Sequence, residues 1–242
     1  FQSVYELASK QAMLGIIANS LIRNNVSLEK EDVMRVLAVQ RRITTTNKAV
    51  NSELLSLCKL LSDNNIESVV VKGQTIGIYY PDPLARTPGD IDFYCDKKNL
   101  PKIISAMATT WGIHAEGKPS EQHFEFIHNS IILELHHCLM KFASKKSQKI
   151  WDDIFLSLKP TYVEIEGCFI PTLEPTLNVL YTFLHLYHHL IELGVGLRQF
   201  CDVAILLKTY HDTIDKKQFF EWLDTLDFRK AFDIVQLILV NI

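Results

Sequence analysis

Two short stretches decide the fold of this chain: SVVVKG at residues 68–73 and DIDFY at residues 90–94. The first is a β-branched run, typical of a buried strand, that ends at a glycine. The second alternates acidic and apolar residues with the period of two that characterises a β-strand. Because residues two apart share one face of a strand, Asp90 and Asp92 point the same way while Ile91 and Phe93 point into a core.

The segments around these two strands alternate between helical and extended patterns. Asn129-Ser130 separates two apolar strand patterns and predicts a hairpin, and a second small hairpin is expected around Gly167. Apolar residues recur at helical spacing through most of the rest. The expected elements are helical patterns at 14–22, 33–39 and 47–61, a strand at 68–71, a helical turn at 74–80, a strand at 90–95, a helix at 99–111, strands at 123–128, 131–137, 162–166 and 168–171, and helices at 174–191, 197–210, 219–226 and 231–240.

This order predicts an α+β fold in which a small mixed sheet is flanked by helical segments. We divide the chain into an N-terminal helical segment (1–65), an α/β core (66–160) and a C-terminal hairpin with a helical segment (161–242). Neither helical group is large enough to bury its apolar face alone. We therefore expect the N-terminal and C-terminal helices to pack together as a second lobe.

The composition is that of an ordinary globular protein. Of 242 residues, 48% are hydrophobic, and 25 basic against 28 acidic residues give a net charge of −3. A disordered chain is excluded, and a general DNA-binding domain is disfavoured because no basic excess is present to neutralise phosphates. The five scattered cysteines form no CxxC pair, which predicts reduced thiols in a cytoplasmic protein. No apolar run is long enough to span a membrane, and we expect one or both natural chain ends to lie outside this sequence.

Three acids predict a metal site. Asp90 and Asp92 repel each other on one strand face, and partial burial increases that repulsion. Glu134 stands in a later apolar strand, between Leu133 and Leu135, where a lone acid is costly without a partner. A divalent cation would relieve both costs, and carboxylate oxygens suit Mg²⁺ or Mn²⁺. The alternative for an isolated Asp-x-Asp pair is an exposed strand edge with two solvated acids.

Lys72 and Gly73 form a candidate phosphate-binding turn. A strand that ends at a glycine and runs into a helix presents free backbone amides to an anion, and Lys72 adds a positive charge. The alternative is an ordinary end of a strand.

The order of strand, Lys-Gly, helix, Asp-x-Asp strand and a lone acid on a later strand resembles the DNA-polymerase-β-like nucleotidyltransferase superfamily. Within it, the chain is most similar to the family of uncharacterised nucleotidyltransferases. The resemblance covers residues 66–140 well and 175–207 more loosely. The matching residues are Lys72, Gly73, Arg86, Asp90, Asp92, His123, Glu134, Leu135, His136, His185, Arg198 and Asp202.

The resemblance implies a polymerase-β-like core that moves a nucleotidyl group from an NTP, with ATP expected, to an acceptor hydroxyl and releases pyrophosphate. Two Mg²⁺ or Mn²⁺ ions about 3.5–4 Å apart would clamp the attacking and leaving oxygens. Asp90 and Asp92 would bridge both ions, while Glu134 would hold the catalytic ion and help deprotonate the acceptor. The implied nucleotide-binding residues are Lys72, Gly73, Arg86 (on the γ-phosphate), His136 and Arg198.

Two departures from the superfamily pattern bear on these roles. Lys72 stands where Ser is common, so charge would replace a hydroxyl contact to phosphate. The third acid is Glu134 instead of the commoner Asp, and its longer arm shifts the metal geometry.

Two pairs of residues are open to more than one interpretation. His136 shares a strand face with Glu134 and either lines the active cleft or packs in the core. Arg198 and Asp202, four residues apart on a helix, form either a simple surface pair or, if that helix faces the cleft, a place where Arg198 binds substrate.

A histidine group and a lysine group have no assigned role. His185 and His189 share a helix face and make a zinc site conceivable, but no HEXXH motif is present, and the roles of His185, His188 and His189 stay open. The lysines between 141 and 149 indicate either a solvated helix face or a contact to RNA.

Two other functions are consistent with these residues. One is a catalytically silent relative that binds a nucleotide or a partner protein, and the other is a metal-dependent phosphohydrolase that releases phosphate. Retention of all three acids argues against silence, because clustered acids without a metal cost stability. The modest net charge favours a small-molecule or protein acceptor over a long nucleic acid.

Overall fold

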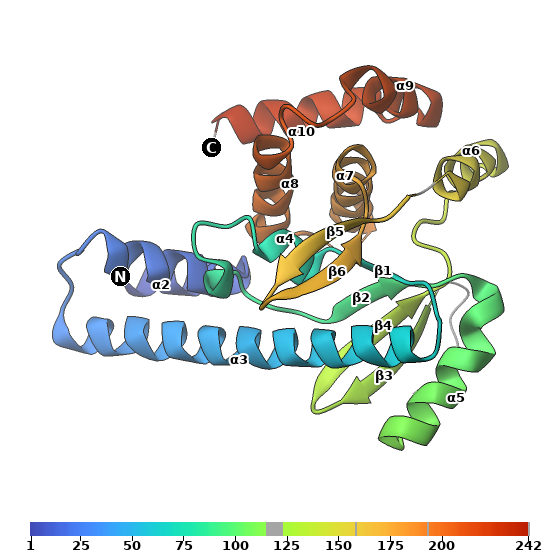
Figure 1. Ribbon diagram of the computed structural model, residues 1–242. Coiled ribbons are helices and arrows are strands. Elements are labelled where there is room, and N and C mark those ends of the chain that lie inside the picture. The colour runs from blue at the N-terminus through green and yellow to red at the C-terminus, as the bar shows by residue number, and fades with distance from the viewer. Residues whose placement is uncertain (115–122, 158, 193, 242) are drawn as a thin grey trace.

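The computed structural model describes residues 1–114, 123–157, 159–192 and 194–241 (Figure 1). In chain order the helices are α1 (Gln2–Lys10), α2 (Leu14–Arg23), α3 (Lys30–Asp63), α4 (Gly73–Gly77), the 3₁₀ turns η1 (Pro83–Ala85) and η2 (Lys97–Asn99), α5 (Leu100–Trp111), α6 (Lys145–Leu156), α7 (Pro175–Glu192), α8 (Leu197–Thr209), α9 (Lys216–Leu226) and α10 (Arg229–Asn241). The strands are β1 (Val69–Val71), β2 (Ile91–Tyr94), β3 (His123–His128), β4 (Ile131–His136), β5 (Thr161–Ile165) and β6 (Cys168–Thr172). The α+β fold class is confirmed.

Within the described ranges, six strands form one mixed sheet in the order β3-β4-β2-β1-β6-β5. Strand β2 runs antiparallel to β1 and parallel to β4. The hairpin β5–β6 joins the other edge of β1 through a parallel pairing of Val70 with Thr172. The sheet therefore continues past residue 160, where the sequence analysis places the end of the α/β core.

Both hairpins form where the turn residues predict them. Asn129 and Ser130 have φ values of 49° and 64°, and Glu166 and Gly167 have φ values of 50° and 81°. Two successive residues in the left-handed region match the twist of the strands that they join, which fixes the hairpin register. In the β3–β4 hairpin that register pairs His123 with His136.

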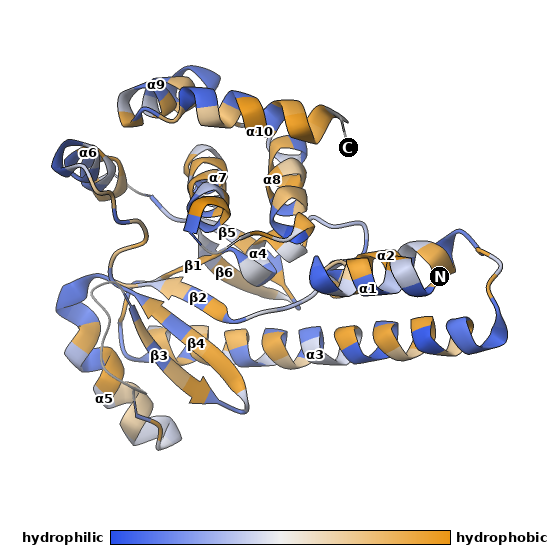
Figure 2. Ribbon diagram, turned by 180° about the vertical axis from the view of Figure 1, so that it is seen from behind, coloured by the Kyte–Doolittle hydropathy of each residue, from blue (hydrophilic) through white to orange (hydrophobic). Residues whose placement is uncertain are grey.

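The two faces of the sheet are covered by different helices. Val70, Phe93 and Leu135 pack with buried residues of α3 and α5 on one face. Val69 and Val71, on the opposite face of β1, pack in a second core with α7 and its neighbours. Figure 1 shows α3 and α7 on opposite sides of the sheet, and α3 alternates between hydrophobic and hydrophilic residues along its length (Figure 2). Burial of each large apolar side chain contributes about 1.5–3 kcal/mol, so both faces hold the sheet in place.

The N-terminal helices have a small core of their own and also pack against the C-terminal helices, as we expected. Helices α1 and α2 pack with the first half of α3 around a small core of their own. They also meet the C-terminal helices: Gln11 accepts hydrogen bonds from the backbone of Leu197 (3.0 Å) and Arg198 (3.4 Å) at the start of α8, and Ile16 packs against the core that contains α7 and α8. Helix α3, which is 34 residues long, extends beyond the sheet, and its first half packs with α1 and α2 (Figure 1).

The irregular loop before β2 is held by the N-terminal helices. Asn47 of α3 donates to the carbonyl oxygens of Leu84 (2.9 Å) and Arg86 (2.8 Å), and Asn19 of α2 donates to Asp82. These bonds fix the path of the chain as it approaches Asp90. Among the described residues, the helices include none that is long and apolar enough to cross a membrane.

Candidate active site

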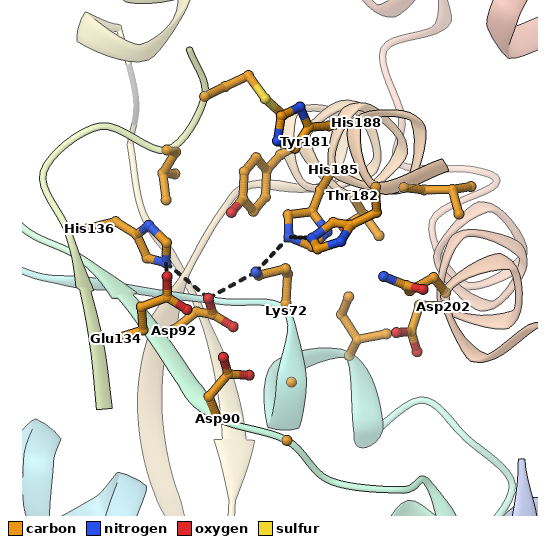
Figure 3. A pocket seen from close by; sticks show the side chains of 18 of the residues that line it. Lys72, Asp90, Asp92, Glu134, His136, Tyr181, Thr182, His185, His188 and Asp202 are labelled. Atoms are coloured by element: carbon orange, nitrogen blue, oxygen red, sulfur yellow. Dashed lines mark hydrogen bonds and ion pairs between the residues drawn. The ribbon is translucent and has the colours of Figure 1, made fainter. Parts of the chain in front are cut away.

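The strand register brings the three predicted acids together. Asp92 lies opposite Val71 of β1 on one side and Glu134 of β4 on the other. Asp90 directly precedes β2, and one carboxylate oxygen from each of Asp90, Asp92 and Glu134 can be chosen so that all three lie within 4.8 Å of one another. Asp92 is buried and Asp90 is exposed. The shared strand face inferred from the sequence thus forms a carboxylate cluster (Figure 3).

This cluster lies in a cleft of about 490 Å³ between the sheet and helices α7 and α8. That volume falls within the range of small-molecule and cofactor sites. The cleft is lined by all the predicted site residues, Lys72, Gly73, Arg86, Asp90, Asp92, Glu134, His136 and Arg198, together with His123, Lys141, Tyr181, His185, His188, His189 and Asp202.

Lys72 is the cation at the centre of the cleft. Its Nζ lies 2.8 Å from Asp92 Oδ1 and 2.9 Å from His185 Nε2 (Figure 3). An ammonium group only donates, so His185 Nε2 is the acceptor. The backbone turns sharply here, with φ of 57° at Lys72 and 47° at Gly73. Glycine suits the left-handed conformation of residue 73, and the turn places Lys72 where β1 ends beside Asp92.

The charges of the cluster shift one another's pKa values. Burial of Asp92 would raise its pKa, but the Lys72 ammonium and a hydrogen bond from His136 hold that pKa well below its usual range. Burial would likewise lower the pKa of Lys72, but the neighbouring Asp92 raises it. Burial and the charge of Asp92 raise the pKa of Glu134 to about 8. Asp92 and Lys72 therefore form an ion pair, while Glu134 holds a proton in the metal-free cleft.

The two strand histidines lie against these carboxylates. His136 Nε2 is 2.9 Å from Asp92 Oδ1 and 3.7 Å from Glu134 Oε1. His123 Nδ1 is 3.3 Å from Glu134 Oε1. Of the two interpretations of His136, the structure supports the one that places it in the cleft.

Arg86 is held by the C-terminal helices. Its Nε and Nη2 donate to the two carboxylate oxygens of Asp202 at 2.8 and 2.7 Å, and the Tyr80 hydroxyl donates to the same carboxylate at 2.7 Å. The side chains of Arg86 and Asp202 are each only 6% exposed. The interpretation of Asp202 as the partner of Arg198 in a helix-surface pair is therefore wrong, since Asp202 faces inward and binds a residue 116 positions away.

Arg198 lines the cleft and keeps part of its hydrogen-bonding capacity. Its Nη1 donates to the carbonyl oxygen of Thr87 at 3.0 Å. Its buried Nε has no hydrogen-bond partner among the described residues. Burial and the charge of Arg86 lower its pKa, which indicates that an anion near this guanidinium would be favourable.

Sequence reasoning missed Tyr181 and the role of His185. Both lie on α7, and Figure 3 shows them projecting into the cleft. The Tyr181 hydroxyl is buried without a hydrogen-bond partner in the described part of the chain. His185 is held as a neutral imidazole, because burial and the Lys72 charge depress its pKa strongly. The spacing of four between Tyr181, His185 and His189 was the available signal, because it puts them on one helix face.

The donor set fits a divalent metal ion of the magnesium type. Three carboxylates converge within 4.8 Å and offer the oxygen ligands that Mg²⁺ and Mn²⁺ prefer. Burial and the charge of Asp92 both disfavour the negative charge of Glu134, and a divalent ion beside it would offset that cost. Asp90, Asp92 and Glu134 are the residues that would hold such an ion.

The protonation of Glu134 predicts how stability depends on pH. The folded protein holds this proton with a pKa of about 8, against an ordinary value of 4.5. The contribution of this pKa difference to the stability of the folded protein is full below about pH 4.5 and is lost as the pH rises toward 8. The metal-free protein should therefore melt at progressively lower temperature across that window.

Mg²⁺ should raise the melting temperature more at the upper end of this pH window. Thermal melting in a chelator and in Mg²⁺ checks this, and in Glu134→Gln this part of the slope should be absent. An unchanged slope in that variant would contradict the assignment.

Comparison with known proteins identifies the fold and the family of this chain. The family model described as uncharacterised nucleotidyltransferase matches residues 1–240. The solution structure of the antibiotic-resistance factor ANT(2'')-Ia has a TM-score of 0.53 at 9% identity and covers 78% of this chain and 96% of that one. The crystal structure of ANT(2'')-Ia in complex with adenylyl-2''-tobramycin has a TM-score of 0.51 at 8% identity and covers 76% of this chain and 99% of that one. A search of curated proteins gave no significant match.

At such low identity the two solved structures establish a shared fold, whereas the family model spans nearly the whole chain. The chain belongs to the family of uncharacterised nucleotidyltransferases.

Proposed function

We propose that this protein transfers a nucleotidyl group from ATP to a hydroxyl of a small acceptor and releases pyrophosphate, with Mg²⁺ or Mn²⁺ bound at Asp90, Asp92 and Glu134. The observation that carries the proposal is the convergence of three carboxylates and Lys72 in one cleft. When bound, two ions would neutralise the triphosphate and stabilise the attacking and leaving oxygens.

The residues of the chain supply alignment and proton transfer. Lys72, at the turn with Gly73, is the charge nearest to the carboxylates and would pair with the triphosphate. Binding of the ion would displace the proton of Glu134, and the carboxylate would then help to deprotonate the acceptor hydroxyl. His136, through its hydrogen bond to Asp92, positions that carboxylate. Most of the rate enhancement would come from alignment and charge neutralisation.

The arginines divide between two roles. Arg86 has two of its three guanidinium nitrogens bound to Asp202 and is almost fully buried, which suits it to hold the loop before β2 against α8. Arg198 has a buried Nε without a partner in the described residues and lines the same cleft. We therefore propose Arg198 as the first candidate for binding the outer phosphates. Arg86 is a second, less accessible candidate for binding the γ-phosphate.

The acceptor is proposed from the size of the cleft and from one relative. A cleft of about 490 Å³ accommodates a nucleotide and a small partner more readily than a polymer. ANT(2'')-Ia, which shares the fold, has been crystallised with adenylyl-2''-tobramycin. A small hydroxyl-bearing molecule, such as an aminosugar, is the acceptor class that both observations support.

Incubation of the protein with ATP, Mg²⁺ and a panel of sugars and aminosugars that includes tobramycin tests this proposal. We expect acceptor-dependent release of pyrophosphate and appearance of an adenylylated product. The same mixture with Asp92→Asn provides the background. Release of inorganic phosphate in place of pyrophosphate would contradict nucleotidyl transfer and favour a phosphohydrolase.

A further inference from the structure

The β3–β4 hairpin carries a second group of metal-ligating side chains beside the carboxylate cluster. The register pairs His123 with His136 and Glu125 with Glu134. Residues paired across two antiparallel strands share one face of the sheet, and residues two apart on a strand share it too. Two histidines and two glutamates therefore project from the same face of one hairpin.

Three of these side chains, those of His123, Glu134 and His136, have metal-binding donor atoms close to one another. The Nδ1 of His123 and the Nε2 of His136 lie 3.3 and 3.7 Å from the same oxygen, Glu134 Oε1. Donor atoms from the three residues can be chosen that all lie within 4.8 Å of one another. Around a tetrahedral ion with bonds of about 2.0 Å, donor atoms lie roughly 3.3 Å apart. The two distances to Glu134 Oε1 are close to this value.

Glu125, the fourth of these residues, lies beside the ring nitrogen of His123 that would face away from the ion. The remote ring nitrogen of His123, Nε2, lies 3.6 Å from Glu125 Oε1. Histidine ligands of metal ions usually direct their second nitrogen to a carboxylate, which fixes the tautomer and the ring orientation.

We propose that His123, Glu134 and His136 bind one zinc-type divalent ion, at a site that shares Glu134 with the magnesium-type cluster of Asp90 and Asp92. Imidazole nitrogens select ions such as Zn²⁺ and Co²⁺, whereas an all-carboxylate set selects Mg²⁺. At His136 the ion would replace the Nε2 proton that now lies between the ring and Asp92. Because all three ligands line the cleft, the site would adjoin any bound substrate.

Metal titration of the chelator-treated protein tests this site without any nucleotide. Zn²⁺ binding is measured by calorimetry and Co²⁺ binding by its visible absorption, on the wild type and on His123→Ala and His136→Ala. His137→Ala is the matched control, since His137 adjoins the same strand but packs against Phe124 outside the cleft. Asp90→Asn removes a carboxylate from the magnesium-type cluster only. Far-UV circular dichroism and melting without metal establish that each variant is folded.

We expect one tight site in the wild type, a loss of at least about 10-fold in affinity in His123→Ala and His136→Ala, and no comparable loss in His137→Ala or Asp90→Asn. Equal Zn²⁺ and Co²⁺ affinity in folded His123→Ala and the wild type would overturn the proposal. A loss in Asp90→Asn as large as in His123→Ala would also overturn it, because the ion would then sit among the carboxylates. Failure of ATP to react bears on nucleotidyl transfer alone and leaves this measurement unaffected.

Discussion

Asp92→Asn should reduce nucleotidyl transfer by about 1000-fold or more. The change keeps the shape of the side chain but removes the charge that Lys72 and His136 now share at 2.8 and 2.9 Å. It also removes the buried member of the carboxylate cluster, so metal-dependent ATP binding should weaken in parallel. Initial rates of pyrophosphate release and calorimetric ATP binding measure the two effects.

Asp212→Asn is the matched control for this prediction. The Asp212 side chain is 93% exposed and does not line the cleft, so the same loss of one negative charge should leave the rate unchanged. A transfer rate in Asp92→Asn within a few-fold of the wild type would show that the cluster does not hold the reacting nucleotide.

Asp202→Ala should lower the free energy of unfolding by about 3–5 kcal/mol. The substitution leaves the Arg86 guanidinium buried without its carboxylate and deprives the Tyr80 hydroxyl of its acceptor. An exposed pair of the kind first considered for Arg198 and Asp202 would contribute only about 0.2–0.5 kcal/mol. Urea unfolding distinguishes these magnitudes directly.

A double-substitution cycle separates the ion pair from the loss of packing. Replacing both Arg86 and Asp202 by apolar residues of similar volume should restore much of the stability, because no buried charge then stays unpaired. A cost below about 1 kcal/mol for Asp202→Ala alone would mean that the pair is not buried in solution as the structure has it.

Local sequence patterns carried most of the information about the carboxylate cluster. The alternation in DIDFY fixed the faces of Asp90, Asp92, Ile91 and Phe93, because the strand period of two leaves no other arrangement. The turn at Asn129-Ser130 fixed the hairpin register, and with it the place of Glu134 and His136. Each of these features depends on residues close together in the sequence.

The features that the sequence analysis did not predict depend on contacts between segments that are far apart in the sequence. Lys72 and His185 are 113 residues apart, and Arg86 and Asp202 are 116 apart, so no local pattern pairs them. The parallel pairing of β6 with β1 depends in the same way on tertiary packing. Helix α3 runs unbroken over 34 residues, although its two apolar patterns at 33–39 and 47–61 resemble separate helices. Its first half packs on α1 and α2 and its second half on the sheet, so the apolar face changes partner along the helix.

The cleft contains both cationic and anionic side chains. Lys72, Arg198 and Lys141 line it together with Asp90, Asp92 and Glu134, while Arg86 and Asp202 neutralise each other. A divalent ion added to this set gives the cleft a net positive charge, which favours a triphosphate. Metal and nucleotide should therefore bind with positive coupling.

Calorimetric titration of ATP into the wild-type protein, with and without Mg²⁺, tests the central claim most directly. We predict saturable binding that requires the ion and that is lost in the Asp90→Ala/Asp92→Ala double variant. If the folded wild-type protein binds none of the four NTPs in the presence of either Mg²⁺ or Mn²⁺, the assignment of the cleft as a nucleotidyl-transfer site is contradicted.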